Sequence, residues 1–291
     1  MTRRYVWRLL SNLRRCTFSG ALVLMAASLP LSEAIASVAA LPSQISSPPA
    51  ASPETTYSVY MPYVGMNTAP CEPIPGETYG ALSIIPPPTD RPAEQHADLN
   101  LALRGYGLTS GVYLGLVTYG GVTDSNAPQL PGLFADNRVP TFSNAYRANQ
   151  WIWAPPPDPG TRGPPITDWP TTLIGMAVSP GEAIRVPSSG YTIGSGYEVL
   201  VLYASTNRIT LKYTREDNVV YGYTIHVENL CVEPNLLVLY RAWNAAGRSQ
   251  LPALRAGQAF GRAIGVELGV AIRDTGAFMD PRSRNDWWQG R

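Results

Sequence analysis

Proline sets the strongest limit on what this chain can fold into. The 291 residues include 28 prolines and 26 glycines, and only 15% of the residues are charged. Proline fixes φ and removes a backbone donor, so it stops helices and keeps strands short. The tyrosines and tryptophans in addition favour strands and turns over long charged helices. The sequence therefore predicts a mainly β fold.

The first 36 residues predict an export signal. Five arginines, at positions 3, 4, 8, 14 and 15, precede an apolar stretch at 18–31, and Ala34-Ile35-Ala36 forms a small-x-small cleavage motif. This is the layout of a signal peptide, and the apolar stretch is shorter than the ~20 residues of a membrane span. We therefore expect residues 1–36 to be removed, and the mature protein to be secreted or held in the cell envelope without a membrane span. A retained N-terminal anchor is the alternative.

Removal of the signal leaves a mildly acidic chain with two cysteines. Five arginines and one glutamate leave with the signal, so 17 basic and 20 acidic residues remain and the net charge is −3. No basic run is present, so nothing favours a nucleic-acid partner. Cys71 and Cys231 would share an oxidising compartment, in which either one disulfide or two separate buried thiols can form. Lys212 is the single lysine, which we attribute to base composition.

The rest of the chain divides by composition into four regions. Residues 37–76 are a linker rich in Pro, Ser and Ala, with a short aromatic segment at 57–64. Residues 77–153 predict strands at 98–104, 112–119 and 145–153, either as a leading subdomain or as part of one sandwich with the last region. Residues 154–170 are a proline-rich connector, in which six prolines at 154–166 exclude regular structure. The last region is 171–291.

The spacing of the apolar residues changes within region 171–291, from a strand pattern to a helical one. The pattern predicts strands at 173–178, 183–186, 197–204, 208–213, 219–227 and 266–273. Leu236, Leu239, Tyr240 and Trp243 then repeat at helical spacing. Pro234 suits a first helical turn and a glycine follows at position 247, so we expect one helix at 234–246.

Several short segments of this region follow one another in the order known from a peptidase family. They are a hairpin with its glycines at 181–186 and 190–193, a strand end Tyr-Thr-Ile-His at 223–226, a Gly-Gln turn at 254–261, and a last strand and Asp-Pro turn at 267–273 and 279–281. This order resembles the lysostaphin-like (LytM-type) zinc endopeptidases of bacterial cell walls, over residues 171–282. The resemblance implies a curled antiparallel β structure of the sandwich type.

The zinc ligands of that family are missing at the matching positions. The family holds its metal with an H-x-x-x-D pair and the second histidine of H-x-H; here these slots fall on Thr171, Gly175, Glu267 and Gly269. A catalytic zinc needs about three nitrogen or oxygen ligands, and glycine offers none. The resemblance therefore implies a scaffold without metal and without catalytic residues. His226 matches the family's auxiliary histidine, but without zinc we favour a strand histidine satisfied by its neighbours.

Other chemistry is less well supported by the residues. The chain has two histidines, and a zinc site on His96, Asp98 and His226 is the one metal alternative. No serine has a G-x-S-x-G setting, and Glu216-Asp217 is typical of a solvated turn rather than of a glycosidase pair. Exposed tryptophans bind sugars or partners, whereas buried ones belong to the core, and the sequence leaves this open for Trp151, Trp153, Trp169, Trp287 and Trp288.

We expect a secreted or envelope-associated, non-catalytic binding domain on a degenerate cell-wall peptidase scaffold. Its ligand would be peptidoglycan or an envelope protein, and no cofactor is expected. The binding groove would be lined by Thr171, Gly175, His226, Glu267 and Gly269. Two alternatives stay open: an active zinc endopeptidase for cell-wall peptides with an atypical ligand set, and a purely structural extracellular module.

Overall fold

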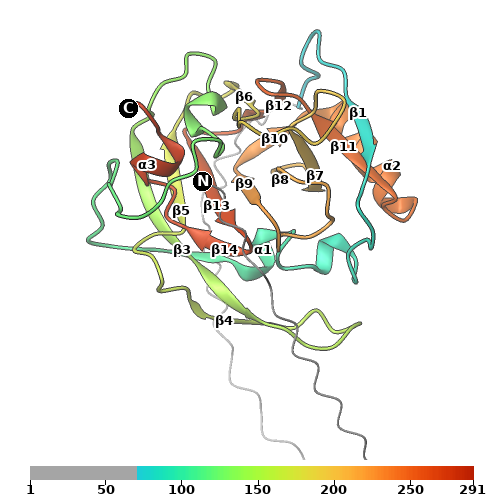
Figure 1. The fold of residues 1–291 in the computed structure, drawn as a ribbon, viewed down its shortest axis with the longest axis horizontal. Helices are drawn as coiled ribbons and strands as arrows, with labels where there is room; N and C mark the ends of the chain where they lie inside the picture. Colours follow the sequence, from blue (N-terminus) through green and yellow to red (C-terminus); the bar gives the residue numbers. More distant parts are fainter. Residues whose placement is uncertain (1–70) are drawn as a thin grey trace, which may run out of the picture. The chain divides into compact units, whose positions relative to one another are not determined.

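Antiparallel strands dominate the computed structural model of the protein, which describes residues 71–291 (Figure 1). The prediction of a mainly β fold is confirmed. The predicted signal peptide at 1–36, most of the linker and the aromatic segment at 57–64 lie outside the described residues. No helix within 71–291 has the length and apolar character needed to cross a membrane.

One large sheet organises the fold. Nine of its strands follow one another in the order β1-β11-β7-β8-β9-β13-β5-β3-β2, while β14 pairs with β13 and β4 pairs with β3. Figure 1 shows this sheet strongly curved. The strands are β1 (Gly80–Ser83), β2 (Tyr106–Leu108), β3 (Phe142–Ile152), β4 (Thr161–Pro165), β5 (Leu173–Ala177), β7 (Val199–Ala204), β8 (Arg208–Lys212), β9 (Tyr223–Glu228), β11 (Gln250–Leu254), β13 (Glu267–Asp274) and β14 (Ala277–Met279).

A second sheet of three strands lies at one end of this architecture. Its order is β10-β12-β6, with β10 at Leu230–Val232, β12 at Ala259–Ala263 and β6 at Ala183–Arg185. Strand β10 follows β9 directly, and Asn229 between them adopts a φ of 62°. Asparagine tolerates this left-handed conformation better than most residues, which lets the chain pass from one sheet to the other.

The large sheet is buried on both faces. Alternate residues of its central strands, such as Leu211, Ile225 and Val270, belong to the main hydrophobic core. The opposite face carries a smaller apolar cluster that includes Leu101 and Phe278. Trp287 and Trp288 are buried in the main core, so these two tryptophans pack rather than bind.

Region 77–153 contributes to the same sheet as the last region. Strand β1 pairs with β11, and β3 pairs with β5. The predicted strand at 145–153 is present as β3, which begins three residues earlier and ends at Ile152. The predicted strands at 173–178, 183–186, 197–204, 208–213 and 266–273 are present as β5, β6, β7, β8 and β13. The one predicted at 219–227 begins only at Tyr223, after a bend in which Gly222 has a φ of 57°.

The predicted helix at 234–246 is confirmed as α2, Pro234–Ala245. Glu233 caps it, because its carboxylate accepts a hydrogen bond from the backbone N–H of Leu236 at 2.7 Å. Leu236 and Tyr240 are buried on one face, whereas Val238 on the other face is exposed. The helix is therefore amphipathic, as its period predicted.

The strand predicted at 98–104 is wrong, because residues 101–104 form a short helix, α1 (Leu101–Arg104). The side chain of Asn100 accepts a hydrogen bond from the N–H of Ala102 and starts this turn. Leu99 and Leu101 are both buried, but they belong to the two different apolar clusters. Their alternation therefore records a chain that crosses between clusters, not a pleated strand.

Two further expectations are corrected by the structure. Residues 112–119 form no strand: Tyr113 is 71% exposed, and one isolated bridge joins Val117 to Ser283. Residues 154–166 do contain regular structure, because β4 (Thr161–Pro165) pairs with β3. Strand β4 lies at an edge and pairs on one side, which is where a sheet tolerates proline.

Cys71 and Cys231 form a disulfide in the structure, with their Cα atoms 5.7 Å apart. The bond links the first described residue to β10 across 160 residues of sequence. Of the two alternatives for these cysteines, the structure has the bonded one.

Candidate functional site

Four of the five residues expected to line a groove are buried. Gly175 on β5 and Gly269 on β13 are register partners, and Glu267 lies beside them. Thr171 and His226 have no exposed surface, and Glu267 is the one partly exposed member. The structure thus brings Gly175, Glu267 and Gly269 together, but the five residues do not form an open groove.

The carboxylate of Glu267 lies at Gly175, one of the positions that the resemblance matches to a zinc ligand. A Cβ added to Gly175 would lie 2.5 Å from Oε2 of Glu267, so the carboxylate packs directly over this glycine. It accepts hydrogen bonds from Ser143, from Asn144 and, at 2.7 Å, from the Tyr146 hydroxyl. Burial raises the pKa of Glu267, but these three donors outweigh burial and lower the pKa overall.

This donor set does not fit zinc. Ser143, Asn144 and Tyr146 direct donors at a carboxylate, whereas zinc needs about three nitrogen, sulfur or carboxylate ligands. Residues 71–291 contain no group of three or more His, Cys, Asp or Glu side chains arranged to hold a metal ion. The arrangement stabilises an ionised glutamate instead.

Substitution of Gly175 by alanine should displace Glu267. The new methyl group would occupy the space of the carboxylate, so the three hydrogen bonds to it must lengthen or break. We expect the free energy of unfolding to fall by about 1–3 kcal/mol in urea titrations. Gly265→Ala is the matched control, since nothing lies within 4 Å of a Cβ there. Equal effects of the two substitutions would contradict this account of Gly175.

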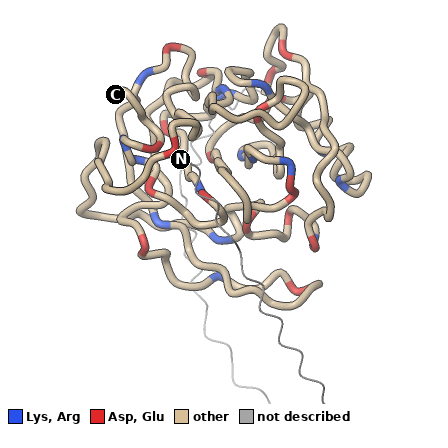
Figure 2. The backbone as a smooth tube through the Cα atoms, viewed as in Figure 1, with Lys and Arg blue, Asp and Glu red and all other residues tan. Residues whose placement is uncertain are grey.

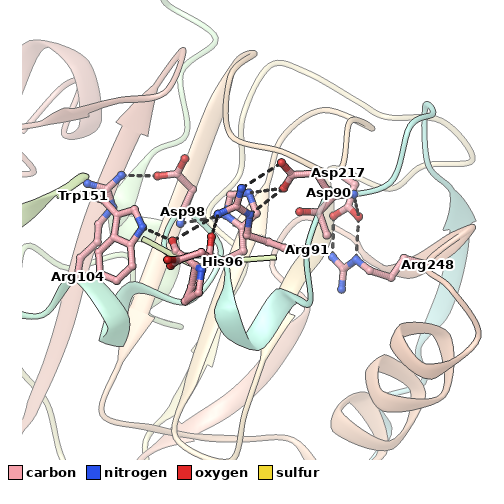
Figure 3. Close-up of polar contacts among 11 residues, drawn as sticks. Asp90, Arg91, His96, Asp98, Arg104, Trp151, Asp217 and Arg248 are labelled. Carbon is pink, nitrogen blue, oxygen red and sulfur yellow. Dashed lines mark hydrogen bonds and ion pairs between the residues drawn. The ribbon is translucent and has the colours of Figure 1, made fainter. Parts of the chain in front are cut away.

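Residues 89–104, here called the strap, carry the polar groups of a second site. At one end of the strap, Asp98 Oδ1 accepts hydrogen bonds from Arg104 at 2.6 Å and from Arg273 at 2.8 Å. At the other end, the Thr89 N–H donates to Asp217, which pairs with Arg248 at 2.6 Å. Figure 3 shows the Asp98–Arg104 contact and the Asp217–Arg248 pair at the two ends of a row of polar side chains. The strap is therefore tied to the sheet by the ion pair of Asp98 with Arg273 on β13 and, at its other end, to Asp217 by the Thr89 N–H.

The charge of Asp98 is held by the two arginines. Burial would raise the pKa of Asp98, but Arg273 and Arg104 hold it far below its usual value. His96 lies two residues away, and its Nδ1 accepts a hydrogen bond from the Asp98 N–H at 3.2 Å. Because the Asp98 carboxylate is already engaged, the alternative zinc set of His96, Asp98 and His226 is not assembled among the described residues.

His226 is fully buried on β9 beneath the strap. The Thr210 hydroxyl donates its one proton to the Leu99 carbonyl at 2.6 Å and also lies 3.0 Å from His226 Nδ1. Nδ1 must therefore carry the imidazole proton, and Nε2 holds a lone pair with no hydrogen-bond partner within residues 71–291. Burial, followed by the charge of Arg273, lowers the pKa of His226 well below its usual value.

This histidine should make the fold acid-sensitive. Its pKa is depressed in the folded state, so below about pH 6.5 the unfolded chain binds more protons and stability falls. His226→Asn keeps a donor at the Nδ1 position but does not titrate. Between pH 7 and pH 5 we expect the variant to lose about 2 kcal/mol less unfolding free energy than the parent. An identical loss in both proteins would contradict a neutral His226.

Four buried polar atoms near the end of β8 have no hydrogen-bond partner among the described residues. They are Lys212 Nζ, Thr214 Oγ1, Glu216 Oε2 and Thr224 Oγ1, here called the polar row. Lys212 and Thr224 are register partners on β8 and β9, and neither residue is exposed. Burial lowers the pKa of Lys212 to about 8, against an opposing effect of Glu216.

Replacement of Lys212 by methionine should stabilise the protein at neutral pH. The folded pKa of Lys212 is depressed from 10.5 to about 8, so its burial costs about 3 kcal/mol below pH 8. As pH rises from 8 towards 10.5, the folded parent releases this proton first and regains stability. We expect the advantage of Lys212→Met to shrink by about 2 kcal/mol between pH 7 and pH 9.5 in urea titrations. If Lys212→Met is instead less stable than the parent, by an amount that does not change with pH, the depressed pKa of the Lys212 amine is contradicted.

A pocket of about 540 Å³ adjoins the polar row. Asp124 lies in it and accepts hydrogen bonds from the hydroxyls of Tyr191 and Tyr223, each at 2.9 Å. Glu216 and Asp274 are two further carboxylates in its wall. The full lining is Ile85, Asp124, Tyr191, Thr192, Ile193, Tyr213, Thr214, Arg215, Glu216, Gly222, Tyr223 and Asp274. This Asp124 pocket combines apolar faces with convergent acceptors, as ligand pockets do.

The remaining aromatic candidates are engaged within the fold. The indole N–H of Trp151 donates to the Pro159 carbonyl, and Trp169 packs edge-on against Tyr119. Trp153 is 42% exposed, but the Arg91 guanidinium already lies over its ring at 4.8 Å. Acidic and basic residues are interspersed along the backbone in Figure 2 rather than gathered by sign.

Comparisons with protein-family models, with curated proteins and with solved structures found no match. The resemblance to lysostaphin-like domains therefore rests on the sequence segments quoted above. The function is therefore inferred from the chemistry of the sites, since a fold alone does not define one.

Proposed function

We propose that the chain is an extracytoplasmic, non-catalytic binding domain whose ligand occupies the Asp124 pocket. The observation that carries this proposal is the pocket itself, in which three carboxylates and two tyrosine hydroxyls converge in about 540 Å³. This volume lies within the range of small-ligand sites. In this proposal the pocket replaces the expected ligand groove around Gly175, because the Glu267 carboxylate there is already bound by Ser143, Asn144 and Tyr146.

Peptidoglycan is the ligand that best suits this pocket. Carboxylates accept hydrogen bonds from amino and hydroxyl groups, and tyrosine rings offer apolar faces to sugar rings or short side chains. Burial raises the pKa of Asp124, but hydrogen bonds from the Asn126 N–H and from the Tyr223 and Tyr191 hydroxyls outweigh burial and lower it, so this acceptor is charged at neutral pH. Sugar–peptide polymers of the cell wall carry all of these groups. The predicted signal peptide at 1–36 would bring the domain to them.

The test is sedimentation of the purified mature chain with isolated cell-wall sacculi. Asp124→Asn removes the charge to which both tyrosines donate, so we expect the apparent affinity to fall about tenfold or more. Asp168→Asn is the control, because Asp168 is exposed and lies outside the pocket. Loss of binding in the Asp124 variant alone supports the proposal.

Two outcomes would overturn it. Sacculus binding that survives Asp124→Asn would place the ligand elsewhere on the molecule. If the parent does not sediment with sacculi, peptidoglycan is not the ligand, and an envelope protein becomes the partner to seek by cross-linking in cells.

A further inference from the structure

The carboxylates of the Asp124 pocket lack the arginine partners that carboxylates have elsewhere in the fold. Asp217 and Asp280 are buried, and each pairs with an arginine at 2.6 Å. Of Asp124, Glu216 and Asp274 in the pocket wall, none makes an ion pair within residues 71–291. A carboxylate that is partly removed from water is stabilised by an opposite charge. The pocket therefore lacks a counter-charge that the fold supplies at its other acidic groups.

Two basic residues of this part of the chain leave the pocket carboxylates unpaired. Arg215 lines the pocket, but its Nε and Nη2 both donate to the Ser83 carbonyl, at 2.9 and 2.5 Å. Lys212 points to the opposite face of the sheet from Tyr213 and Tyr223, and its amine has no hydrogen-bond partner among the described residues. Three carboxylates and one guanidinium thus give the pocket wall a net charge of −2.

Aromatic and aliphatic side chains form the apolar part of the same wall. Asp124 Oδ2 accepts hydrogen bonds from the hydroxyls of Tyr191 and Tyr223, each at 2.9 Å, which holds both rings beside the carboxylate. Tyr191 is 42% exposed, so its ring is partly open to a ligand. Ile85 and Ile193 add aliphatic surface. Tyrosine rings attract cations at their faces, and alkyl chains gain free energy when apolar surface covers them.

The arrangement suits an organic cation better than a metal ion. Residues 71–291 hold no group of three carboxylates gathered closely enough to bind a metal. The pocket carboxylates are instead spread around a space of about 540 Å³. A primary ammonium group has three N–H donors that point in different directions, so it can reach acceptors that do not meet at one point. The Thr214 hydroxyl lies in the same wall, has no partner within the described chain, and is a further acceptor.

We infer that the Asp124 pocket selects ligands that carry a primary ammonium group at the end of an alkyl chain, as the side chain of a diamino acid does. The ammonium group binds Glu216 and Asp274, and the alkyl chain packs against the tyrosine rings and Ile85. This inference rests on the proposed function and names the group of peptidoglycan that the pocket recognises. An uncharged ligand would leave the carboxylates unbalanced, and an anionic one would be repelled by them.

Chemical modification of the sacculi tests the inference without any change to the protein. Acetic anhydride, followed by mild base to free esterified hydroxyls, acetylates the amino groups and removes their charge. Reductive methylation with formaldehyde and borohydride modifies the same groups but keeps the charge. With the full mature chain we expect acetylation to weaken binding at least about tenfold and methylation to leave it nearly unchanged. Equal binding to acetylated and untreated sacculi would overturn the inference.

A soluble probe and pocket variants assign the contacts. In calorimetric titrations, Nα-acetyl-lysine amide should bind at least about tenfold more tightly than its Nε-acetylated form. Glu216→Gln and Asp274→Asn should each reduce this preference, because each removes one negative charge from the wall. Asp168→Asn should preserve it, since this exposed residue lies outside the pocket lining. No binding of the lysine probe, or a preference that persists in both pocket variants, would contradict the inference.

These results can be separated from a failure of the proposed function. Sacculus binding that depends on Asp124 but not on the amino groups of the sacculi would refute the inference alone. If the parent does not sediment with sacculi but binds the lysine probe with the stated preference, the proposed ligand is wrong and the ammonium preference of the pocket stands.

Discussion

The Asp98 carboxylate between Arg104 and Arg273 is the interaction on which the rest of the structure depends. Arg104 belongs to the strap and Arg273 to the central strand β13, so one carboxylate fixes the strap across the outer face of the sheet. Removal of Asp98 would leave two buried guanidinium groups without their shared partner, which is far more costly than the loss of an exposed pair. The position of the strap then decides which strand side chains lose contact with water.

The strap covers polar side chains of β8 and β9, and burial of a polar group is unfavourable unless it finds a hydrogen-bond partner. The Thr210 hydroxyl donates to the Leu99 carbonyl of the strap, and His226 Nδ1 donates to the Thr210 hydroxyl. Lys212 and Thr224, further along the same strand pair, find no partner among residues 71–291. Shifted pKa values such as that of Lys212 are found preferentially at functional sites.

The sequence predicts the local elements well and the sites poorly. Helix α2 and strands such as β7 follow directly from helical and apolar patterns. The strap was missed because Leu99 and Leu101 alternate like a strand while serving two clusters, and β4 was missed because an edge strand tolerates proline. The Asp124 pocket had no sequence signal, because Asp124 and Asp274 are far apart in the sequence and meet only in the folded chain. Lys212, as the single lysine, was visible in the sequence, but only its burial gives it meaning.

The most direct test of this account is the titration of Lys212 by NMR in protein labelled with ¹⁵N-lysine. One lysine in the chain means one side-chain signal, so the assignment is unambiguous. A buried amine without a partner should titrate at about pH 8. A midpoint near the ordinary 10.5 would show that the amine is solvated or paired, and would contradict the burial of an unpartnered amine in the polar row.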